Sequence, residues 1–286
     1  MELQKIISLA NKKSELPFLA MERSLRATGC NLPLWVIPYD NNRFELPANA
    51  AWWEIPEILN WADENKLWPA FKKIQCLTTD NFQFVDSDII FFSNPAEVLQ
   101  PFDGFITSCT HWNNPAHTYT PESLVFLKEK STTWPKFVFN SGQWACDSAL
   151  YEVKELIHFC EHHYIDTLFK KNYLYKDQAG INLLVNYKNI TITNLTLPPV
   201  NMESTWAGDY LDEYAFKKFE ENKKPYIIHW AGTPVENNRF INQYLFKFLN
   251  EEQQKVMLSG NKKKPGSIAD VLKEKFKKTY HFIKGF

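Results

Sequence analysis

Glycine is scarce in this 286-residue chain, and nucleotide-binding motifs built on glycine are missing. The sequence has 9 Gly and contains neither G-x-G-x-x-G nor G-x-x-x-x-G-K-[ST], which argues against a glycine-rich phosphate loop. No apolar run approaches the length that spans a bilayer. The amino-terminal MELQKIISLANKK has only a short apolar run, so we expect no signal peptide.

Cysteines are few and the net charge is low, and each of these features argues against particular classes of protein. The 5 cysteines are widely spaced and form no C-x-x-C pair, so neither a zinc ribbon nor a disulfide framework is expected. A reducing, cytoplasmic location is the default for such a chain. The net charge of −1 argues against a globally basic nucleic-acid binder, and we expect no nucleic-acid partner.

Aromatic residues are the excess, at 15% of the chain, and suit a stiff core or an aromatic-lined cleft. The chain opens with an apolar run at Lys5–Ala10, a helical pattern over Glu15–Thr28 and a second apolar run at Leu34–Pro38. Strand, helix and strand in this order predict a βαβ unit and a parallel sheet covered on both faces. The predicted fold class is therefore mixed α/β.

The remainder of the chain continues this alternation. Cys109–Lys136 is irregular, polar and aromatic, and we expect a loop over a site there. The further predicted elements are helical Ala50–Leu77 with breaks near Pro56 and Pro69, a strand over Phe82–Phe92 with an acidic break, a strand at Phe137–Ser141, helical Ser148–Lys171, a helix over Asp177–Asn186, a strand at Asn189–Leu195 and a strand at Pro225–Trp230.

The sharpest local signal is F-V-D-S-D-I-I-F-F, in which Asp86 and Asp88 flank Ser87 between apolar residues. Carboxylates at i and i+2 on a strand share a face and can converge on one cation. Oxygen ligands of this kind suit Mg²⁺ or Mn²⁺, which also bind substrate phosphates. The alternative is a surface turn between two strands, but burying two carboxylates without a cation would be costly.

Three weaker motifs follow along the chain, and each has an ordinary structural explanation. His229 ends the apolar I-I-H-W-A-G and could be a third ligand or a core histidine bonded to a carbonyl group. Asn140 and Gly142, in F-N-S-G, could bind a hydroxyl-rich ligand or form a simple turn. Asp177 and Gln178 precede an apolar helix, where a capping pair is the alternative.

In this order the motifs resemble those of a GT-A glycosyltransferase, most of all the sugar-nucleotide transferases of family 8. The resemblance covers Lys5–Gln243. It implies a Rossmann-like, mainly parallel sheet flanked by helices, a UDP-sugar donor, Mn²⁺ or Mg²⁺, and transfer with retention to a hydroxyl acceptor. The resemblance further implies that Asp86, Asp88 and His229 hold the metal and that Asp177 and Gln178 flank the anomeric carbon as catalytic residues.

The donor-binding positions implied by the resemblance are Asn11, Lys73, Asp86, Ser87, Asn140, Gly142, Gly232 and Arg239. The family has a lysine in a G-x-x-K-P-W pattern, whereas Gly232 here precedes T-P-V-E-N-N, which leaves Arg239 as the substitute. Asn11 falls where the base is held, although the first strand lacks the acidic pair of the family. Lys72 competes with Lys73 for the basic position before the two aspartates.

On the acceptor side, the predicted loop Cys109–Lys136 offers Trp112, His117 and Tyr119 to a sugar face, although most aromatic residues belong to the core. Two other functions stay open. A sugar-nucleotide nucleotidyltransferase would normally have a glycine-rich basic loop after the first strand. A non-catalytic sugar- or membrane-binding domain would have lost turnover.

The carboxyl-terminal end differs in composition, and we predict a transferase domain at 1–255 and a basic aromatic tail at 256–286. Asn261–Phe286 has eight lysines against Asp270 and Glu274. An anionic membrane surface, on the inner face of a membrane, is one expected partner. Each lysine near such a surface contributes about 1 kcal/mol of binding free energy. This would fit a glycan or lipid-linked acceptor. The alternative is a solvated, lysine-rich end.

Overall fold

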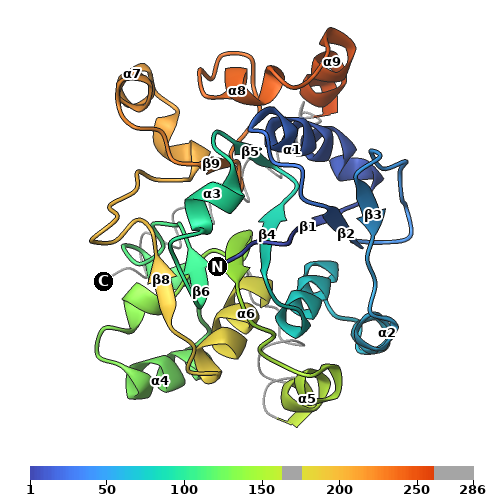
Figure 1. Ribbon diagram of the computed structural model, residues 1–286, viewed down its shortest axis with the longest axis vertical. Coiled ribbons are helices and arrows are strands. Elements are labelled where there is room, and N and C mark those ends of the chain that lie inside the picture. Colours follow the sequence, from blue (N-terminus) through green and yellow to red (C-terminus); the bar gives the residue numbers. More distant parts are fainter. Residues whose placement is uncertain (163–175, 261–286) are drawn as a thin grey trace, which may run out of the picture.

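A mainly parallel sheet forms the centre of the molecule (Figure 1). The structure, a computed structural model, describes residues 1–162 and 176–260. Within these residues the sheet has seven strands in the order β3-β2-β1-β4-β7-β6-β8. Only β7 runs antiparallel to both its neighbours. The strands are β1 (Lys5–Ala10), β2 (Leu34–Pro38), β3 (Ala50–Trp52), β4 (Phe82–Asp86), β6 (Phe105–Thr107), β7 (Gln143–Cys146) and β8 (Ile192–Asn194). The predicted mixed α/β class is confirmed.

A second, two-stranded sheet lies beside the first and joins distant parts of the chain. It pairs β5 (Ile89–Phe91) with β9 (Ile227–His229) in antiparallel register. The acidic break predicted within Phe82–Phe92 is present, and it separates two strands that belong to different sheets. The chain leaves the main sheet after Asp86, where β4 ends, and re-enters a sheet only by pairing with β9.

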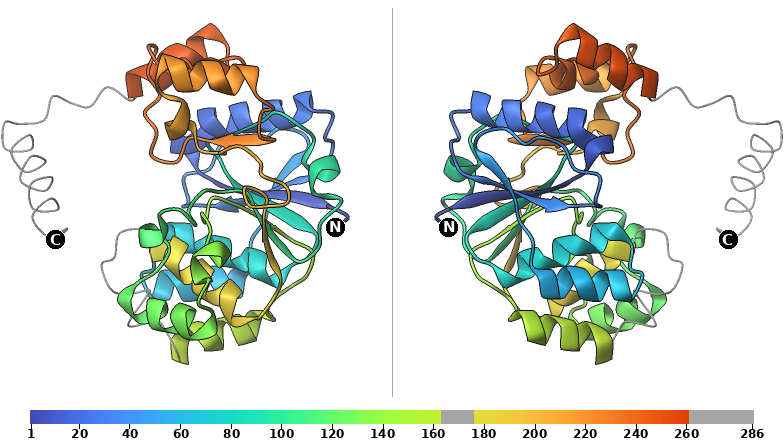
Figure 2. Two further views of the ribbon diagram at one scale, coloured as in Figure 1. Left: turned by 90° about the vertical axis from the view of Figure 1, so that its left-hand side faces the viewer. Right: turned by 90° about the vertical axis from the view of Figure 1, so that its right-hand side faces the viewer.

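Helices cover both faces of the main sheet (Figure 2). On one side lie α1 (Glu15–Ala27), α7 (Glu213–Glu221), α8 (Asn242–Phe246) and α9 (Glu251–Gly260). The other side carries α2 (Pro56–Glu64), the 3₁₀ helix η2 (Pro69–Thr78), α4 (Pro121–Lys130), α5 (Val153–Phe159) and α6 (Lys176–Tyr187). The shorter elements are α3 (Pro95–Leu99) and the 3₁₀ helices η1 (Lys12–Ser14), η3 (Pro115–His117), η4 (Trp134–Phe137) and η6 (Ala207–Tyr210).

The central strand β1 is buried along its whole length, as the apolar run Lys5–Ala10 predicts for a parallel strand covered on both faces. Successive side chains of a strand point to opposite faces. Accordingly, Ile7 and Leu9 belong to the core under η2 and α6, whereas Ile6 and Ala10 belong to the core under α1. The strand ends thus sit on a rigid, two-sided core.

The prediction of a strand at Phe137–Ser141 is wrong, because the strand β7 begins only at Gln143. The side chain of Asn182 takes the place of a neighbouring strand at this point. Its Oδ1 accepts a hydrogen bond from the Phe139 N–H (2.9 Å), and its Nδ2 donates to the Phe139 carbonyl (2.8 Å). The F-N-S-G segment is therefore held as a loop over α6.

Two further predictions need correction. The segment Cys109–Lys136 is not irregular throughout, since Pro121–Lys130 forms α4 behind a capping box of Thr120 and Ser123. Ala50–Leu77 is not helical throughout, since it starts with the edge strand β3.

Parts of the chain lie outside the described residues. These include residues 163–171 of the predicted helix Ser148–Lys171, which begins only at Val153 in α5, and the lysine-rich segment 261–286. The helix α9 crosses the predicted domain boundary at 255, and that division stays a prediction. None of the helices in the described part of the chain is both long and apolar enough to cross a membrane.

Candidate active site

Three side chains that could ligate a cation converge where β4, β5 and β9 meet. Asp86 is the last residue of β4, Asp88 precedes β5, and His229 is the last residue of β9. His229 Nε2 lies 3.1 Å from Asp88 Oδ1 and 3.8 Å from Asp86 Oδ2. One ligand atom from each residue lies within 4.8 Å of the other two. The pairing of Ile89 with His229 sets this approach.

Gly142 makes room for this group of three. The Asp86 N–H donates to its carbonyl oxygen (2.7 Å), which brings the F-N-S-G loop against the end of β4. A Cβ atom at Gly142 would clash with both Asp86 Oδ2 and His229 Cε1. The absence of a side chain at Gly142 lets the side chains of Asp86 and His229 approach the backbone closely.

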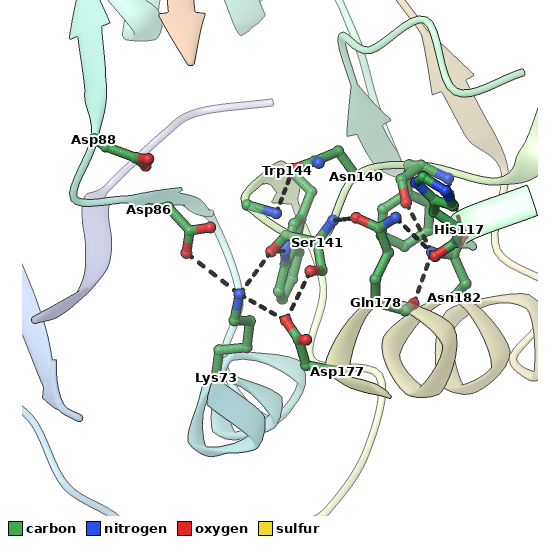
Figure 3. A network of polar contacts seen from close by, with 12 residues as sticks. Lys73, Asp86, Asp88, His117, Asn140, Ser141, Trp144, Asp177, Gln178 and Asn182 are labelled. Atoms are coloured by element: carbon green, nitrogen blue, oxygen red, sulfur yellow. Dashed lines mark hydrogen bonds and ion pairs between the residues drawn. The ribbon is translucent and has the colours of Figure 1, made fainter. Parts of the chain in front are cut away.

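The ammonium group of Lys73 connects the three residues to a second acidic position (Figure 3). Its side chain is 3% exposed, and Nζ lies 3.3 Å from Asp86 Oδ1 and 3.1 Å from Asp177 Oδ2. It also donates to the Ser141 carbonyl (3.3 Å). Asp177 Oδ2 in turn accepts a hydrogen bond from Ser141 Oγ (2.9 Å). The competing Lys72 pairs with the exposed Asp63 instead.

Charge at this site does not balance among the side chains. Among residues 1–162 and 176–260, with His229 neutral, the carboxylates of Asp86, Asp88 and Asp177 face the ammonium of Lys73, which leaves two negative charges. Burial works to lower the pKa of Lys73, but Asp86 and Asp177 outweigh it and raise the pKa above its ordinary value. Burial works to raise the pKa of Asp177, and Lys73 and Ser141 outweigh it and lower the pKa.

Asp86, Asp88 and His229 change one another's pKa values through the same opposition of burial and charge. Burial works to lower the pKa of His229, but the carboxylates of Asp88 and Asp86 raise it above its ordinary value. Burial works to raise the pKa of Asp88, and His229 lowers it. Burial raises the pKa of Asp86, and the opposing effects of Lys73 and His229 do not fully offset it.

This donor set fits a divalent cation. Two carboxylate oxygens and one imidazole nitrogen, in a site with two uncompensated negative charges, are a combination that suits Mn²⁺ and is compatible with Mg²⁺.

Gln178 lies near the site with both ends of its amide engaged. Its Oε1 accepts a hydrogen bond from the Ser141 N–H (3.2 Å), and its Nε2 donates to the His117 carbonyl (2.9 Å). Gln178 therefore ties the F-N-S-G loop to η3 (Figure 3). Asn140 Oδ1 accepts a hydrogen bond from the Gly142 N–H (2.7 Å) and shapes the same loop. The predicted catalytic role of Gln178 stays a prediction.

Asn11, the predicted contact to a base, directly follows β1, the strand that lies next to β4 in the sheet. Its Oδ1 accepts hydrogen bonds from the N–H groups of Lys13 and Ser14 and so caps η1. Its Nδ2 donates to Asp40 Oδ2 (2.7 Å), an acidic partner that lies just after β2. Parallel strands bring these two polar residues to one edge, which is where ligands bind in open α/β sheets.

Three donor positions implied by the resemblance remain, namely Ser87, Gly232 and Arg239. Ser87 lies in the turn between Asp86 and Asp88. Gly232 follows β9 with a φ of 66°, a conformation that favours glycine. Arg239 pairs with Glu236 (3.4 Å).

The acceptor-side residues of the predicted loop are also placed. Trp112 Nε1 donates to Thr196 Oγ1 (3.0 Å), and Tyr119 packs edge-on against Trp134. His117 approaches the site through its carbonyl group.

Sequence reasoning missed two residues of this region. Ser141 stood inside the F-N-S-G motif, and its hydroxyl group could have been noticed beside Asn140. His111 gives no local signal, although burial, with a smaller effect of His229, lowers its pKa to about 4. Only the tertiary structure brings it toward the site.

Solved structures share this architecture, at low sequence identity. The structure titled WbbM bifunctional glycosyltransferase, in its apo form, superimposes with a TM-score of 0.60 at 14% identity over 90% of this chain. The glycosyltransferase GlyE of Streptococcus pneumoniae TIGR4 gives 0.50 at 11% identity over 91%. The fold is that of known glycosyltransferases. The chain spans 51% of the WbbM chain and 63% of the GlyE chain. No protein-family model and no curated protein matches the sequence.

Proposed function

We propose that this protein is a glycosyltransferase that moves a sugar from a nucleotide-sugar donor to a hydroxyl acceptor with the help of a divalent ion. One observation carries the proposal: Asp86, Asp88 and His229 lie within 4.8 Å of one another, in a fold shared with WbbM and GlyE. In α/β sheets of this kind, ligands bind outside the carboxyl ends of the strands.

The reaction requires stabilisation of the diphosphate as the bond to the sugar breaks. Mn²⁺ or Mg²⁺, when bound, would supply positive charge beside the leaving diphosphate. Asp86, Asp88 and His229 would hold it, and Lys73 orients Asp86 for this task. Because Oδ1 of Asp86 faces the ammonium of Lys73, Oδ2 is left facing His229. Such preorganisation reduces the reorganisation needed during the reaction.

The sugar side of the site is built by Asp177 and the F-N-S-G loop. Asp177 and Asn140 would bind sugar hydroxyls, and Gln178 would lie below the anomeric carbon while it fixes the loop. We further propose a UDP-sugar donor and transfer with retention, supported by the order of the D-x-D, F-N-S-G, D-Q and His229 motifs. In a retaining transfer the departing phosphate can accept the proton of the acceptor. An inverted anomer in the product, measured by NMR, would refute retention.

A panel of UDP- and GDP-sugars with Mn²⁺, read out as nucleotide release, tests the function. Asp88→Asn should remove most of the release, because the negative charge is lost and the remaining amide oxygen is a weaker ligand than a carboxylate. Asp103→Asn is the matched control, since its carboxylate is 92% exposed and pairs with the amino terminus at the other end of the sheet. Release that persists in Asp88→Asn with EDTA would refute the metal role.

The panel also separates the rival functions. A nucleotidyltransferase would release pyrophosphate from a nucleoside triphosphate and a sugar phosphate instead. A non-catalytic domain would bind UDP with Mn²⁺ in calorimetry and turn over none of the sugars.

We also propose that the segment 261–286 attaches the protein to anionic lipid, which would suit a glycan or lipid-linked acceptor. Its charge of eight lysines against two acidic residues supports this. Co-sedimentation with phosphatidylserine vesicles should fall when Lys262, Lys263 and Lys264 are replaced by Gln. Vesicle binding by this variant that equals wild-type binding, at both low and high salt, would refute the attachment.

A further inference from the structure

Trp206 is an exposed aromatic residue directly beside the candidate cation group. It forms a parallel β-bridge with His229, and the His229 N–H donates to the carbonyl of the preceding Thr205 (2.7 Å). Residues paired in this way carry their side chains on the same face. The indole therefore projects on the side of the imidazole. It is nevertheless 45% exposed, whereas Trp144 and Trp230 are almost fully buried.

The ring is fixed in place although it is exposed. Its Nε1 donates to the Ala231 carbonyl (2.9 Å), two residues after His229. The six-membered part of the ring lies on Gly208, where a Cβ atom would clash with it. The backbone thus holds the indole at Nε1 and at its six-membered ring. The exposed part of the indole forms a fixed apolar surface that faces solvent. Binding there orders no flexible side chain, which lowers the entropy cost.

Polar groups accompany the ring in the same turn. Ser204 Oγ accepts a hydrogen bond from the Trp206 N–H (3.2 Å) and donates to Asp209 Oδ2 (2.5 Å). The side chain of Asp209 is exposed. A flat exposed ring, whose backbone N–H is bonded to a hydroxyl group that is paired with an exposed carboxylate, matches a molecule that has an apolar face and a rim of hydroxyl groups. A pyranose ring has this character, because its axial C–H groups line one face and its hydroxyl groups project from the edge.

We propose that Trp206 is the stacking surface for a pyranose ring of the acceptor, with Asp209 and Ser204 bonded to its hydroxyl groups. The acceptor class is thus a saccharide. The inference rests on the proposed function only in naming this sugar the acceptor. A sugar stacked on Trp206 would lie next to the His229–Ala231 segment, so one of its hydroxyl groups can face the proposed donor position. Trp206 would be a binding residue that sets acceptor affinity, not donor binding.

Ligand-observed saturation-transfer NMR tests the stacking without any need for turnover. The probes are methyl pyranosides of glucose, galactose, mannose, N-acetylglucosamine and rhamnose, with UDP and Mg²⁺ present. Sorbitol is the control ligand, because it has hydroxyl groups but no ring face. We expect at least one pyranoside to receive saturation mainly on the C–H protons of one face, and sorbitol to receive none.

Three variants separate stacking from a structural effect. Trp206→Ala should weaken the binding of that pyranoside about tenfold, and Trp206→Phe should retain part of it. Gly208→Ala should also weaken binding, because the added Cβ displaces the ring without removing it. Tyr214→Ala is the matched control, since this ring on α7 is 69% exposed and should not affect binding.

The outcomes distinguish this inference from the proposed function. Failure of every pyranoside to bind the wild type, or equal binding by Trp206→Ala and the wild type, overturns the Trp206 surface. Release of nucleotide from a nucleotide-sugar with unchanged KM for the donor in Trp206→Ala supports an acceptor role. A raised donor KM with an unchanged acceptor KM overturns it. Absence of any nucleotide release refutes the proposed function alone, because the saccharide binding is measured separately.

Discussion

Replacement of Lys73 by Met removes the one ammonium that the structure places between Asp86 and Asp177. The methionine side chain has a similar unbranched shape, so packing under the site is largely preserved. The two carboxylates, 3.3 and 3.1 Å from the ammonium in the wild type, are then left without it. The change therefore tests the charge of Lys73 more than its volume.

The expected loss of stability is large, because the ion pair is buried. Removal of one partner of a buried pair costs about 3–5 kcal/mol, since the remaining charge is uncompensated. Domains are commonly stable by only about 5–15 kcal/mol. With a urea m-value of about 3 kcal/mol/M, the midpoint of unfolding should fall by about 1–2 M at pH 7.5.

The loss should depend on pH in a particular direction. In the wild type the pKa of Asp177 lies below its ordinary value, because Lys73 and Ser141 outweigh burial. Its ionised form therefore contributes stability above pH 3.8, and this contribution is lost as the pH falls through the lowered pKa. Without Lys73, burial dominates, the pKa of Asp177 rises, and protonation relieves the variant. The difference between the two proteins should shrink toward pH 4.

Urea denaturation followed by circular dichroism, in EDTA at pH 7.5 and pH 4, measures both effects. Lys72→Met is the matched control in the same helix η2. Lys72 pairs with an Asp63 side chain that is 68% exposed, so its loss should cost about 0–1 kcal/mol. A Lys73→Met cost that is the same at both pH values, or no larger than that of Lys72→Met, would refute the reasoning.

Three further predictions concern the cation group and the core. Gly142→Ala should abolish Mn²⁺ binding in calorimetry and cost about 1–3 kcal/mol of stability, because the added Cβ meets Asp86 and His229. Mn²⁺ affinity should rise with pH through the imidazole titration and then level off. Burial works to lower the pKa of His229 but Asp88 raises it, so a proton competes with the metal at low pH. Trp144→Ala should cost about 3–5 kcal/mol in urea denaturation, because the buried indole contacts Phe84 and Phe105.

Each of these has a result that would contradict it. Normal Mn²⁺ binding by Gly142→Ala would show that the three residues do not need this approach. An Mn²⁺ affinity that is equal at pH 6 and pH 8, with no proton released, would exclude His229 from the ligand set. A loss below 1 kcal/mol for Trp144→Ala would mean that the core collapses around the gap.

The order of elements was predictable wherever the apolar pattern itself selects the structure. The runs at Lys5–Ala10 and Leu34–Pro38 are strands as expected, and the helix over Asp177–Asn186 is present. Where side chains replace backbone pairing, the pattern misled. Phe137–Ser141 has the composition of a strand, yet both backbone groups of its central Phe139 are bonded by Asn182, which lies more than forty positions away. Local sequence carries no sign of such a partner.

The candidate site was predictable in its residue types and less so in its connections. Asp86 and Asp88 could be proposed from their place in an apolar run, and His229 joined them through the family resemblance, since the strand pattern alone left it as a ligand or a core histidine. That Lys73 joins Asp86 to Asp177, and that Trp206 lies beside His229, depends on pairings between distant segments. Spacing along the chain does not encode these contacts, since a bridge such as Trp206 to His229 is formed only when the sheets assemble.

The turn at Asp86–Asp88 is also where the chain passes from the seven-stranded sheet to the two-stranded one, while His229 arrives from the opposite end of the sequence. No backbone hydrogen-bond ladder therefore runs from one sheet to the other at this point. An ion bound by all three residues would link the early part of the chain to the late part. Occupancy and fold stability would then be thermodynamically linked, and an ion at a hundred times its dissociation constant would add about 2.7 kcal/mol. Removal of the ion would then weaken the contact between these two parts of the chain, at the place where the proposed donor binds.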